Sequence, residues 1–315
     1  MRRFAWTLPA AAMLVSACSS VASTARVAAP TSSTASTSAP GRGAPAASRA
    51  AAPGSPETSA SRPPEPAQRS NPASPPVLPM AAGGGSARFP RTATGILVGK
   101  VVVIDPGHNG GNTAAPSVIN SLIWNGRETE ACDTTGAQTD SGYTEAEFNW
   151  NVARYLAADL RAEGATVVLT RTGNTGVGPC VTERAVIGNG ARGNAAVSVH
   201  ADGGPPGGRG FAILEPVADG INNAIVGPSA TLGSDLRTAF AQGTGEPVSS
   251  YDGIAGIQPR SDLAGTNLST IPKVFIECAN MRNATDAALV TSRRWQAKAA
   301  QAIAAGLAAF LRAAR

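Results

Sequence analysis

The sequence is poor in histidine, in aromatic residues and, over most of its length, in net charge. Only two of its 315 residues are His, 4% are aromatic, and residues 19–88 contain no Phe, Trp or Tyr. A segment with so few large apolar groups cannot offset its chain entropy by burial, which excludes a folded core from it. The positive net charge of +5 comes from residues 1–88, which contain eight Arg and only two Glu. Residues 89–315 carry a net charge of −1. The near-neutral remainder excludes a basic face for nucleic acid.

The first residues are typical of an export signal. A basic start at residues 1–3 precedes an apolar stretch, residues 4–15, that is too short to span a bilayer. Val15-Ser16-Ala17-Cys18 resembles a bacterial lipobox, whose cysteine becomes the lipidated first residue. We therefore expect residues 1–18 to be a lipoprotein signal peptide and Cys18 to be lipidated. The protein would be exported and anchored to a membrane, facing the periplasm or cell wall; plain secretion is the alternative.

Residues 19–97 have the composition of a linker. Ala, Ser, Thr, Pro and Gly dominate, prolines favour extended conformations, and residues 83–85 are a run of three glycines. We expect a disordered tether that allows an anchored domain to reach the cell-wall layer. Residues 98–315 are long enough for a single folded domain with a sizeable core.

Strand and helix patterns alternate through residues 98–315. Short apolar, β-branched runs predict strands at residues 100–104, 165–169, 195–199, 211–214 and 273–277. Amphipathic patterns predict helices at residues 144–164, 183–189 and 233–241 and from residue 292 to the end. This order predicts an α/β fold in which a mostly parallel or mixed, twisted sheet is covered by helices on both faces.

Both histidines follow predicted buried strands. His108 ends the run from Val101 and His200 ends the run from Ala195, so both imidazoles are expected at the carboxyl edge of the sheet, where ligands bind. Two imidazoles delivered to one edge are typical of a metal site. The alternative is a pair of unrelated structural histidines.

A carboxylate would complete the three protein ligands that a catalytic zinc site usually has. Thr144 and Glu147 form a capping-box pattern, with Thr144 as N-cap and Glu147 at the third helical position. Glu147 is then engaged with the cap, whereas Glu145 is free to point off the helix start. Glu145 is therefore the expected ligand and Glu147 its rival; a carboxylate that only favours the helix dipole is the alternative for Glu145.

Glu277 ends a predicted strand and follows the apolar residues Val274, Phe275 and Ile276. A carboxylate there is costly unless it has a partner, and the carboxyl edge would bring it near the metal. Its expected role is general base toward water and then proton donor to a leaving amine. The alternative is a structural salt bridge.

These motifs together resemble the zinc-dependent N-acetylmuramoyl-L-alanine amidases often called amidase 3. The matching segments are Asp105-Pro106-Gly107-His108-Asn109-Gly110-Gly111, Glu145 four positions before Asn149, Ser198-Val199-His200-Ala201-Asp202, and Glu277 after the late strand. The resemblance covers about residues 98–315. It implies one Zn²⁺ ion held by His108, Glu145 and His200, with Glu277 as the catalytic residue.

The sequence departs from the family pattern at two places. Asn109 replaces the usual glycine, and Cys278-Ala279-Asn280 follows Glu277 where the family often has glycine. Residues 256–265 resemble a substrate-side loop of the family, in which Arg260 could pair with a stem-peptide carboxylate or be an ordinary surface arginine. Asn109 and Arg260 are the candidate substrate-binding residues.

The remaining cysteines divide into a loop pair and a strand residue. Cys132 and Cys180 lie in predicted loops, so in an oxidising compartment we expect a disulfide between them. Cys278 stands beside Glu277, and we interpret it as a small buried apolar residue rather than a nucleophile.

The sequence thus predicts a monomeric hydrolase that cleaves the amide between N-acetylmuramic acid and L-alanine in peptidoglycan or muropeptides. Two alternatives remain: a non-catalytic peptidoglycan-binding or regulatory lipoprotein, and another zinc peptidase such as a carboxypeptidase.

Overall fold

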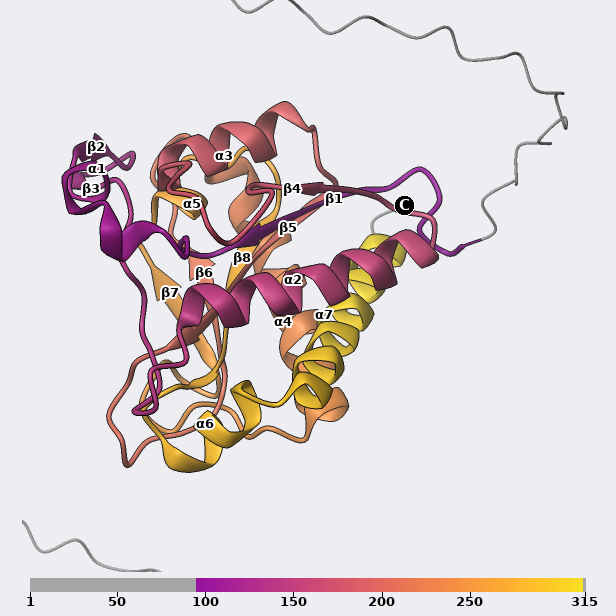
Figure 1. The fold of residues 1–315 in the computed structure, drawn as a ribbon. Coiled ribbons are helices and arrows are strands. Elements are labelled where there is room, and N and C mark those ends of the chain that lie inside the picture. The colour runs from indigo at the N-terminus through magenta and orange to yellow at the C-terminus, as the bar shows by residue number, and fades with distance from the viewer. Residues whose placement is uncertain (1–94, 314–315) are drawn as a thin grey trace, which may run out of the picture. The chain divides into compact units, whose positions relative to one another are not determined.

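A six-stranded mixed sheet forms the centre of the domain in the computed structural model, which describes residues 95–313 (Figure 1). The strand order is β4-β1-β5-β8-β6-β7. The strands are β1 (Val101–Pro106), β4 (Thr166–Leu169), β5 (Ala195–Asp202), β6 (Ala212–Pro216), β7 (Ile257–Arg260) and β8 (Lys273–Asn280). Strands β4, β1, β5 and β8 are mutually parallel, whereas β6 runs antiparallel to β8 and parallel to β7.

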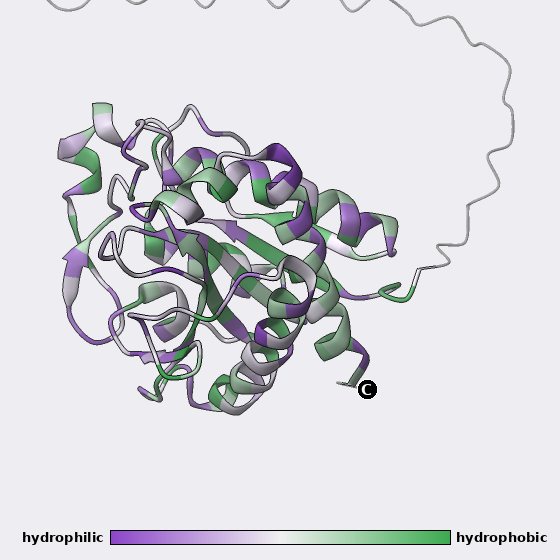
Figure 2. Cartoon of the chain, turned by 90° about the horizontal axis from the view of Figure 1, so that it is seen from below, coloured by the Kyte–Doolittle hydropathy of each residue, from purple (hydrophilic) through white to green (hydrophobic). Residues whose placement is uncertain are grey.

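Helices cover both faces of this sheet, as the sequence predicts. The larger core lies under three long helices, and two shorter helices lie on the opposite face (Figure 1). The long helices are α2 (Glu145–Ala162), α4 (Asn223–Thr244) and α7 (Arg293–Ala313), and the opposite pair is α3 (Val181–Gly190) and α5 (Ala264–Asn267). Figure 2 shows hydrophobic strands between helices that carry both hydrophobic and hydrophilic residues. The fold class predicted from the sequence is therefore confirmed.

The smaller elements gather around the ends of the sheet. They are the 3-10 turn η1 (Asn112–Ala114), α1 (Pro116–Ile119), β2 (Leu122–Trp124), β3 (Thr129–Ala131) and α6 (Ala284–Val290). Strands β2 and β3 pair as a separate antiparallel hairpin. These elements, β7 and α5 have no counterpart in the sequence prediction, because they are too short to carry a readable periodicity.

Helix α4 begins well before the predicted residue 233. Pro228 lies inside it and removes one backbone hydrogen bond, which is why the sequence favours a break there. The helix continues through Pro228 because Ile225 and Leu232 are buried, and the buried Ser229 Oγ accepts a hydrogen bond from the backbone N–H of Lys273 at 3.0 Å. Packing on the sheet therefore outweighs the local cost.

Two strands extend further than predicted. β5 runs to Asp202 and β8 to Asn280, and these two end residues still pair. His200 therefore lies inside β5 and not behind it, and Glu277 lies inside β8 and not at its end, although both remain near the carboxyl edge.

Within residues 95–313 no helix has the length and hydropathy needed to cross a bilayer. The signal peptide at 1–18, the lipidation of Cys18 and all but the last residues of the tether at 19–97 lie outside the described residues.

Candidate metal centre

The alternation of side chains along β5 and β8 places His200 and Glu277 on one face. The two residues are register partners in neighbouring parallel strands, so their side chains project to the same side of the sheet. Val199 and Ile276, one position earlier, are fully buried in the large core under α2 and α7. His200 and Glu277 therefore face the other side, where the ring of His200 stacks on Phe275 with centroids 5.2 Å apart.

His108, Glu145 and His200 form a compact group of candidate ligands. One ligand atom from each residue lies within 4.8 Å of the other two. Glu145 Oε1 is 3.3 Å from His108 Nε2 and 3.0 Å from His200 Nδ1, and the two imidazole rings stand nearly perpendicular, 5.0 Å apart. The structure thus brings together the three residues that the sequence predicts as ligands.

The start of α2 decides between the two glutamates. Thr144 is the N-cap and its Oγ1 accepts a hydrogen bond from the backbone N–H of Glu147, while the side chain of Glu147 is exposed. Glu145 is buried, and its carboxylate accepts hydrogen bonds from Ala137 N at 2.7 Å and Ala201 N at 3.2 Å. Glu145 faces the histidines, and Glu147 faces away from them.

The site is electrostatically suited to a positive charge. Although burial disfavours protonated imidazole, the carboxylates of Glu145 and Asp133 raise the pKa of His108 to about 10. Burial raises the pKa of Glu145, but the two histidines outweigh it and hold that pKa well below its ordinary value. The group therefore favours an ionised carboxylate beside a cation, and a divalent metal would displace a proton on binding.

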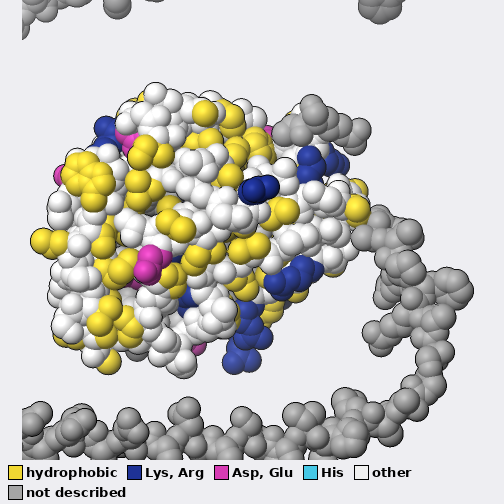
Figure 3. Space-filling view, turned by 90° about the horizontal axis from the view of Figure 1, so that it is seen from above, with side chains coloured by type: hydrophobic (Ala, Val, Ile, Leu, Met, Phe, Trp, Pro, Cys, Tyr) yellow, Lys and Arg dark blue, Asp and Glu magenta, His cyan; other side chains and the backbone are white. Residues whose placement is uncertain are grey.

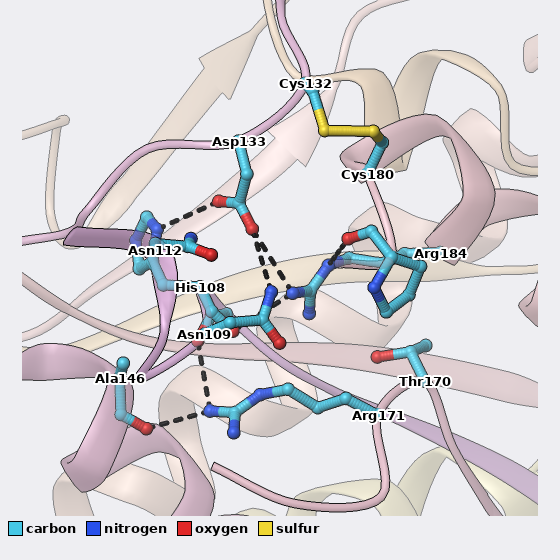
Figure 4. A network of polar contacts seen from close by, with 12 residues as sticks. His108, Asn109, Asn112, Cys132, Asp133, Ala146, Thr170, Arg171, Cys180 and Arg184 are labelled. Atoms are coloured by element: carbon cyan, nitrogen blue, oxygen red, sulfur yellow. Dashed lines mark hydrogen bonds and ion pairs between the residues drawn. A yellow bond between two sulfur atoms is a disulfide. The ribbon is translucent and has the colours of Figure 1, made fainter. Parts of the chain in front are cut away.

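The loop that carries His108 is fixed by two buried arginines (Figure 4). His108 adopts a left-handed conformation with φ 57°, which is uncommon outside glycine and needs support from its surroundings. Arg184 donates to Pro106 O at 2.6 Å and His108 O at 3.0 Å. Arg171 donates to Pro106 O at 2.9 Å and Gly107 O at 3.3 Å. The backbone carbonyls on both sides of the turn are thus held by guanidinium groups.

Asp133 orients the imidazole of His108 from outside the ligand group. Its Oδ1 lies 3.2 Å from His108 Nδ1, and its Oδ2 accepts from Asn109 at 3.2 Å and Arg184 at 3.4 Å (Figure 4). A carboxylate on one ring nitrogen leaves the other, Nε2, free to face a metal. The preceding residue, Cys132, forms a disulfide with Cys180 at the start of α3. The disulfide expected from the loop cysteines is therefore present, and it fixes the segment that carries Asp133.

Two glycines allow the ligands to approach the backbone. A Cβ on Gly107 would lie 2.1 Å from Cε1 of His200, and a Cβ on Gly136 would lie 2.7 Å from Cδ2 of His108. Gly136 also has φ +73°, where other residues are strained. Larger residues at either position would push a histidine out of place.

A cavity of about 380 Å³ opens over the ligand group. Glu277 lines it, and Leu214, Leu263 and Phe275 form apolar wall. Burial, together with the carboxylates of Glu145 and Asp202, raises the pKa of Glu277 well above its ordinary value. Glu277 Oε2 is buried and has no hydrogen-bond partner among the described residues. An unpaired buried carboxylate oxygen in a cavity is typical of a residue that acts on a ligand.

The other three candidate residues have different surroundings. Arg260 lines the cavity but forms a two-fold ion pair with Asp262, at 2.7 and 2.6 Å. Asn109 is buried with its amide turned to Asp133, and it does not line the cavity of the ligand group. Cys278 is fully buried in the large core, on the face opposite Glu277, and burial raises the pKa of its thiol. Asn109 therefore positions Asp133, and Cys278 packs as an apolar residue.

Sequence reasoning missed Asp133, Arg171 and Arg184. Asp133 and Arg184 contact each other across 51 positions of the chain, and no local pattern reports such a contact. Only Asp133 had a signal in the sequence: it directly follows Cys132, which was expected to form a disulfide.

Comparisons with known proteins identify the family of this chain. The family model of N-acetylmuramoyl-L-alanine amidases, Amidase_3, matches residues 102–309. An N-acetylmuramoyl-L-alanine amidase of Mycobacterium tuberculosis is 42% identical over 68% of this chain and 88% of its own length. The crystal structure of the amidase Ami1 from Mycobacterium smegmatis is 42% identical, with TM-score 0.65, over 68% of this chain and 98% of that one. Ami1 from Mycobacterium abscessus is 41% identical, with TM-score 0.64, over 68% and 99%. The chain belongs to the N-acetylmuramoyl-L-alanine amidase family.

Proposed function

We propose that this protein hydrolyses the amide between N-acetylmuramic acid and L-alanine in peptidoglycan with one Zn²⁺ ion held by His108, Glu145 and His200. The observation that carries the proposal is the convergence of these three ligand atoms within 4.8 Å beside the unpaired carboxylate of Glu277. The family membership of residues 102–309 supports the choice of reaction, and the geometry supports the choice of residues.

The donor set fits zinc. Two imidazoles and one carboxylate are a common protein ligand set for catalytic zinc, and they leave one position open. Metal ligands are usually oriented by further hydrogen bonds, and the candidate ligands have such partners. Asp133 contacts His108, and two backbone N–H groups donate to Glu145. When bound, zinc would polarise the amide carbonyl and lower the pKa of a coordinated water molecule.

Glu277 is the base of the proposed reaction. Its raised pKa suits a carboxyl group that takes a proton from the attacking water and returns it to the nitrogen of the leaving L-alanine. The apolar wall of Leu214, Leu263 and Phe275 limits the access of other water molecules. Water attacks the carbonyl carbon of the lactyl group, the C–N bond breaks, and the stem peptide leaves with a free amino terminus.

We further propose that the enzyme works outside the cytoplasm as a monomeric lipoprotein. The support is the lipobox-like sequence that ends at Cys18 and the long linker composition of residues 19–97. The disulfide between Cys132 and Cys180 agrees with an oxidising compartment. The catalytic domain would then be residues 98–315.

Metal analysis of matched variants tests the assignment of roles. Wild-type protein should hold one zinc per chain, whereas His108→Ala, His200→Ala and Glu145→Gln should lose most of it. Glu277→Gln should keep the zinc while its turnover falls by about 10²–10⁴-fold, because an amide cannot accept a proton. Full zinc occupancy in His200→Ala, or near-normal turnover of zinc-loaded Glu277→Gln, would overturn the assignment.

A further inference from the structure

An exposed tryptophan stands on the hairpin beside the catalytic cavity. Trp124 is 59% exposed and Leu122, two residues earlier on the same strand, is 75% exposed. Residues two apart on a strand share a face, so the two side chains form one apolar surface. In Figure 3, hydrophobic side chains lie at the end of the domain where Figure 1 places the hairpin β2–β3, and most basic side chains lie elsewhere.

This surface lies next to the edge of the cavity. Leu122 pairs with Ala131 and Trp124 pairs with Thr129, so each pair lies on the same face of the hairpin. Ala131 lines the cavity that contains His108, His200 and Glu277, and so does Glu130 on the other face of the hairpin. Leu122 and Trp124 lie outside the cavity lining. Trp124 stands two residues further along the strand, which is about 7 Å from that cavity wall.

The hairpin is held rigidly in place. Its base is fixed by backbone hydrogen bonds from Cys132 to Ser121 O at 2.8 Å and from Asp133 to Ile119 O at 3.1 Å. Its turn is organised by the buried Asn125, whose side chain accepts from two backbone N–H groups and donates to Asp262 O. A rigid aromatic side chain loses little conformational entropy when a ligand covers it.

We propose that Trp124 and Leu122 form a subsite for the glycan strand of the substrate, with a pyranose ring of the adjoining sugar stacked on the indole of Trp124. This inference rests on the proposed function, because an amide on muramic acid brings a sugar chain to the mouth of the cavity. The apolar C–H face of a pyranose matches an exposed indole, and the exposed Thr129 opposite Trp124 offers a hydroxyl to the sugar edge.

Binding of a sugar without a stem peptide tests the subsite separately from catalysis. Isothermal titration of the zinc-loaded full chain with the β-1,4-linked tetramer of N-acetylglucosamine measures binding without turnover, because the tetramer has no muramoyl-alanine amide. Wild-type protein should bind the tetramer, and Trp124→Ala should raise its Kd at least about tenfold. Tyr155→Ala, which removes an exposed aromatic residue from α2, is the matched control and should bind as wild type does.

Kinetics then connect the subsite to the reaction. Trp124→Ala should raise KM for long glycan strands about tenfold and leave kcat/KM for a single muramoyl dipeptide unchanged. Equal tetramer binding by wild type and Trp124→Ala, or no binding by either, would overturn the proposal. A wild-type dimer that Trp124→Ala converts to monomer would also overturn it, because the surface would then serve contact between two copies.

Discussion

At the scale of single residues, the site depends on how each ligand is held as much as on the ligands themselves. The ring of His108 is fixed by Glu145 on Nε2 and, on Nδ1, by Asp133 and the backbone carbonyl of Thr134. Asp133 is in turn held by Arg184 and Asn109. The imidazole therefore faces the cavity in one orientation, with its tautomer set by a carboxylate.

Replacing Asp133 with Asn should weaken metal binding without removing a ligand. The amide still fits the space but no longer offers a charged acceptor to His108 Nδ1, so we expect the zinc Kd to rise about 10–100-fold. Competition with a chromophoric chelator measures this. Asp140→Asn, which alters an 80% exposed side chain on the same loop, is the control. Unchanged zinc affinity in Asp133→Asn would remove Asp133 from the site.

The grouping of the three candidate ligands could be predicted from the sequence because the position of each residue follows from a local rule. Strand patterns place His108 and His200 at one edge of the sheet, and the N-cap at Thr144 fixes which glutamate points off α2. Asp133 and Arg171 obey no such rule, since their partners are decided by how loops cross in three dimensions. Asn109 illustrates the limit, because its side chain turns inward to Asp133 and not toward the substrate.

At the scale of elements, the disulfide links the loop before α2 to the start of α3. Val181 N also donates to Cys132 O at 2.8 Å, and the Glu183 carboxylate accepts from Cys180 N at 2.8 Å. Arg184, on the next turn of α3, contacts both Asp133 and the His108 loop. The disulfide thus holds the start of α3, and with it Arg184, beside the candidate metal site.

Replacing both Cys132 and Cys180 with Ser should therefore lower stability and zinc affinity together. The bridge spans 48 residues, so the chain-entropy model gives a loss of roughly 4 kcal/mol in the free energy of unfolding. Urea unfolding measures the stability, and chelator competition measures the affinity. If the folded double variant bound zinc with unchanged affinity, the disulfide would stabilise the fold but would have no role in positioning Asp133.

A second link joins the loop after β5 to α6 and to the segment that follows α4, through one arginine between two carboxylates. Arg209 contacts Glu246 at 2.9 Å and Asp286 at 3.0 Å. Burial and the nearby Asp286 carboxylate raise the pKa of Glu246 to about 7, although Arg209 opposes the shift. The folded protein therefore holds a proton on Glu246 that the unfolded chain releases near pH 4.5.

This raised pKa predicts that stability falls as pH rises. The contribution of neutral Glu246 is fully present below about pH 4.5 and is lost as pH rises to about 7, for a total of about 3 kcal/mol. Urea unfolding of wild type and Glu246→Gln between pH 5 and 8 measures it. The free energy of unfolding should fall less steeply with pH in the variant, because the substituted amide cannot bind or release a proton. An identical pH dependence in the two proteins would exclude Glu246 as the source of the effect.

At the scale of the whole molecule, the sequence predicted the sheet and its two helical faces but not the extent of every element. Helix α4 passes Pro228 because its buried face rests on the sheet, a tertiary effect that no local propensity reports. The short elements around the cavity were also missed. Among them is the hairpin β2–β3, which carries Trp124.

Replacing Cys18 with Ser should move the protein from the membrane fraction to the soluble fraction, because the proposed lipid attachment site is lost. Immunoblotting of fractionated cells measures the distribution, and Cys278→Ala is the control that leaves the lipobox intact. A wild-type protein found only in the soluble fraction would contradict the anchor while leaving the catalytic account unaffected.

If the cavity over His108, Glu145 and His200 hydrolyses the muramoyl-alanine amide, digestion of muropeptides in H₂¹⁸O must label the sugar product. Mass spectrometry of the products should find one ¹⁸O atom in the lactyl carboxylate of muramic acid and an unlabelled stem peptide that begins with L-alanine. Zinc-loaded Glu277→Gln should give little of either product. Label in a new C-terminal carboxylate of the stem peptide, with the muramoyl amide intact, would contradict the account.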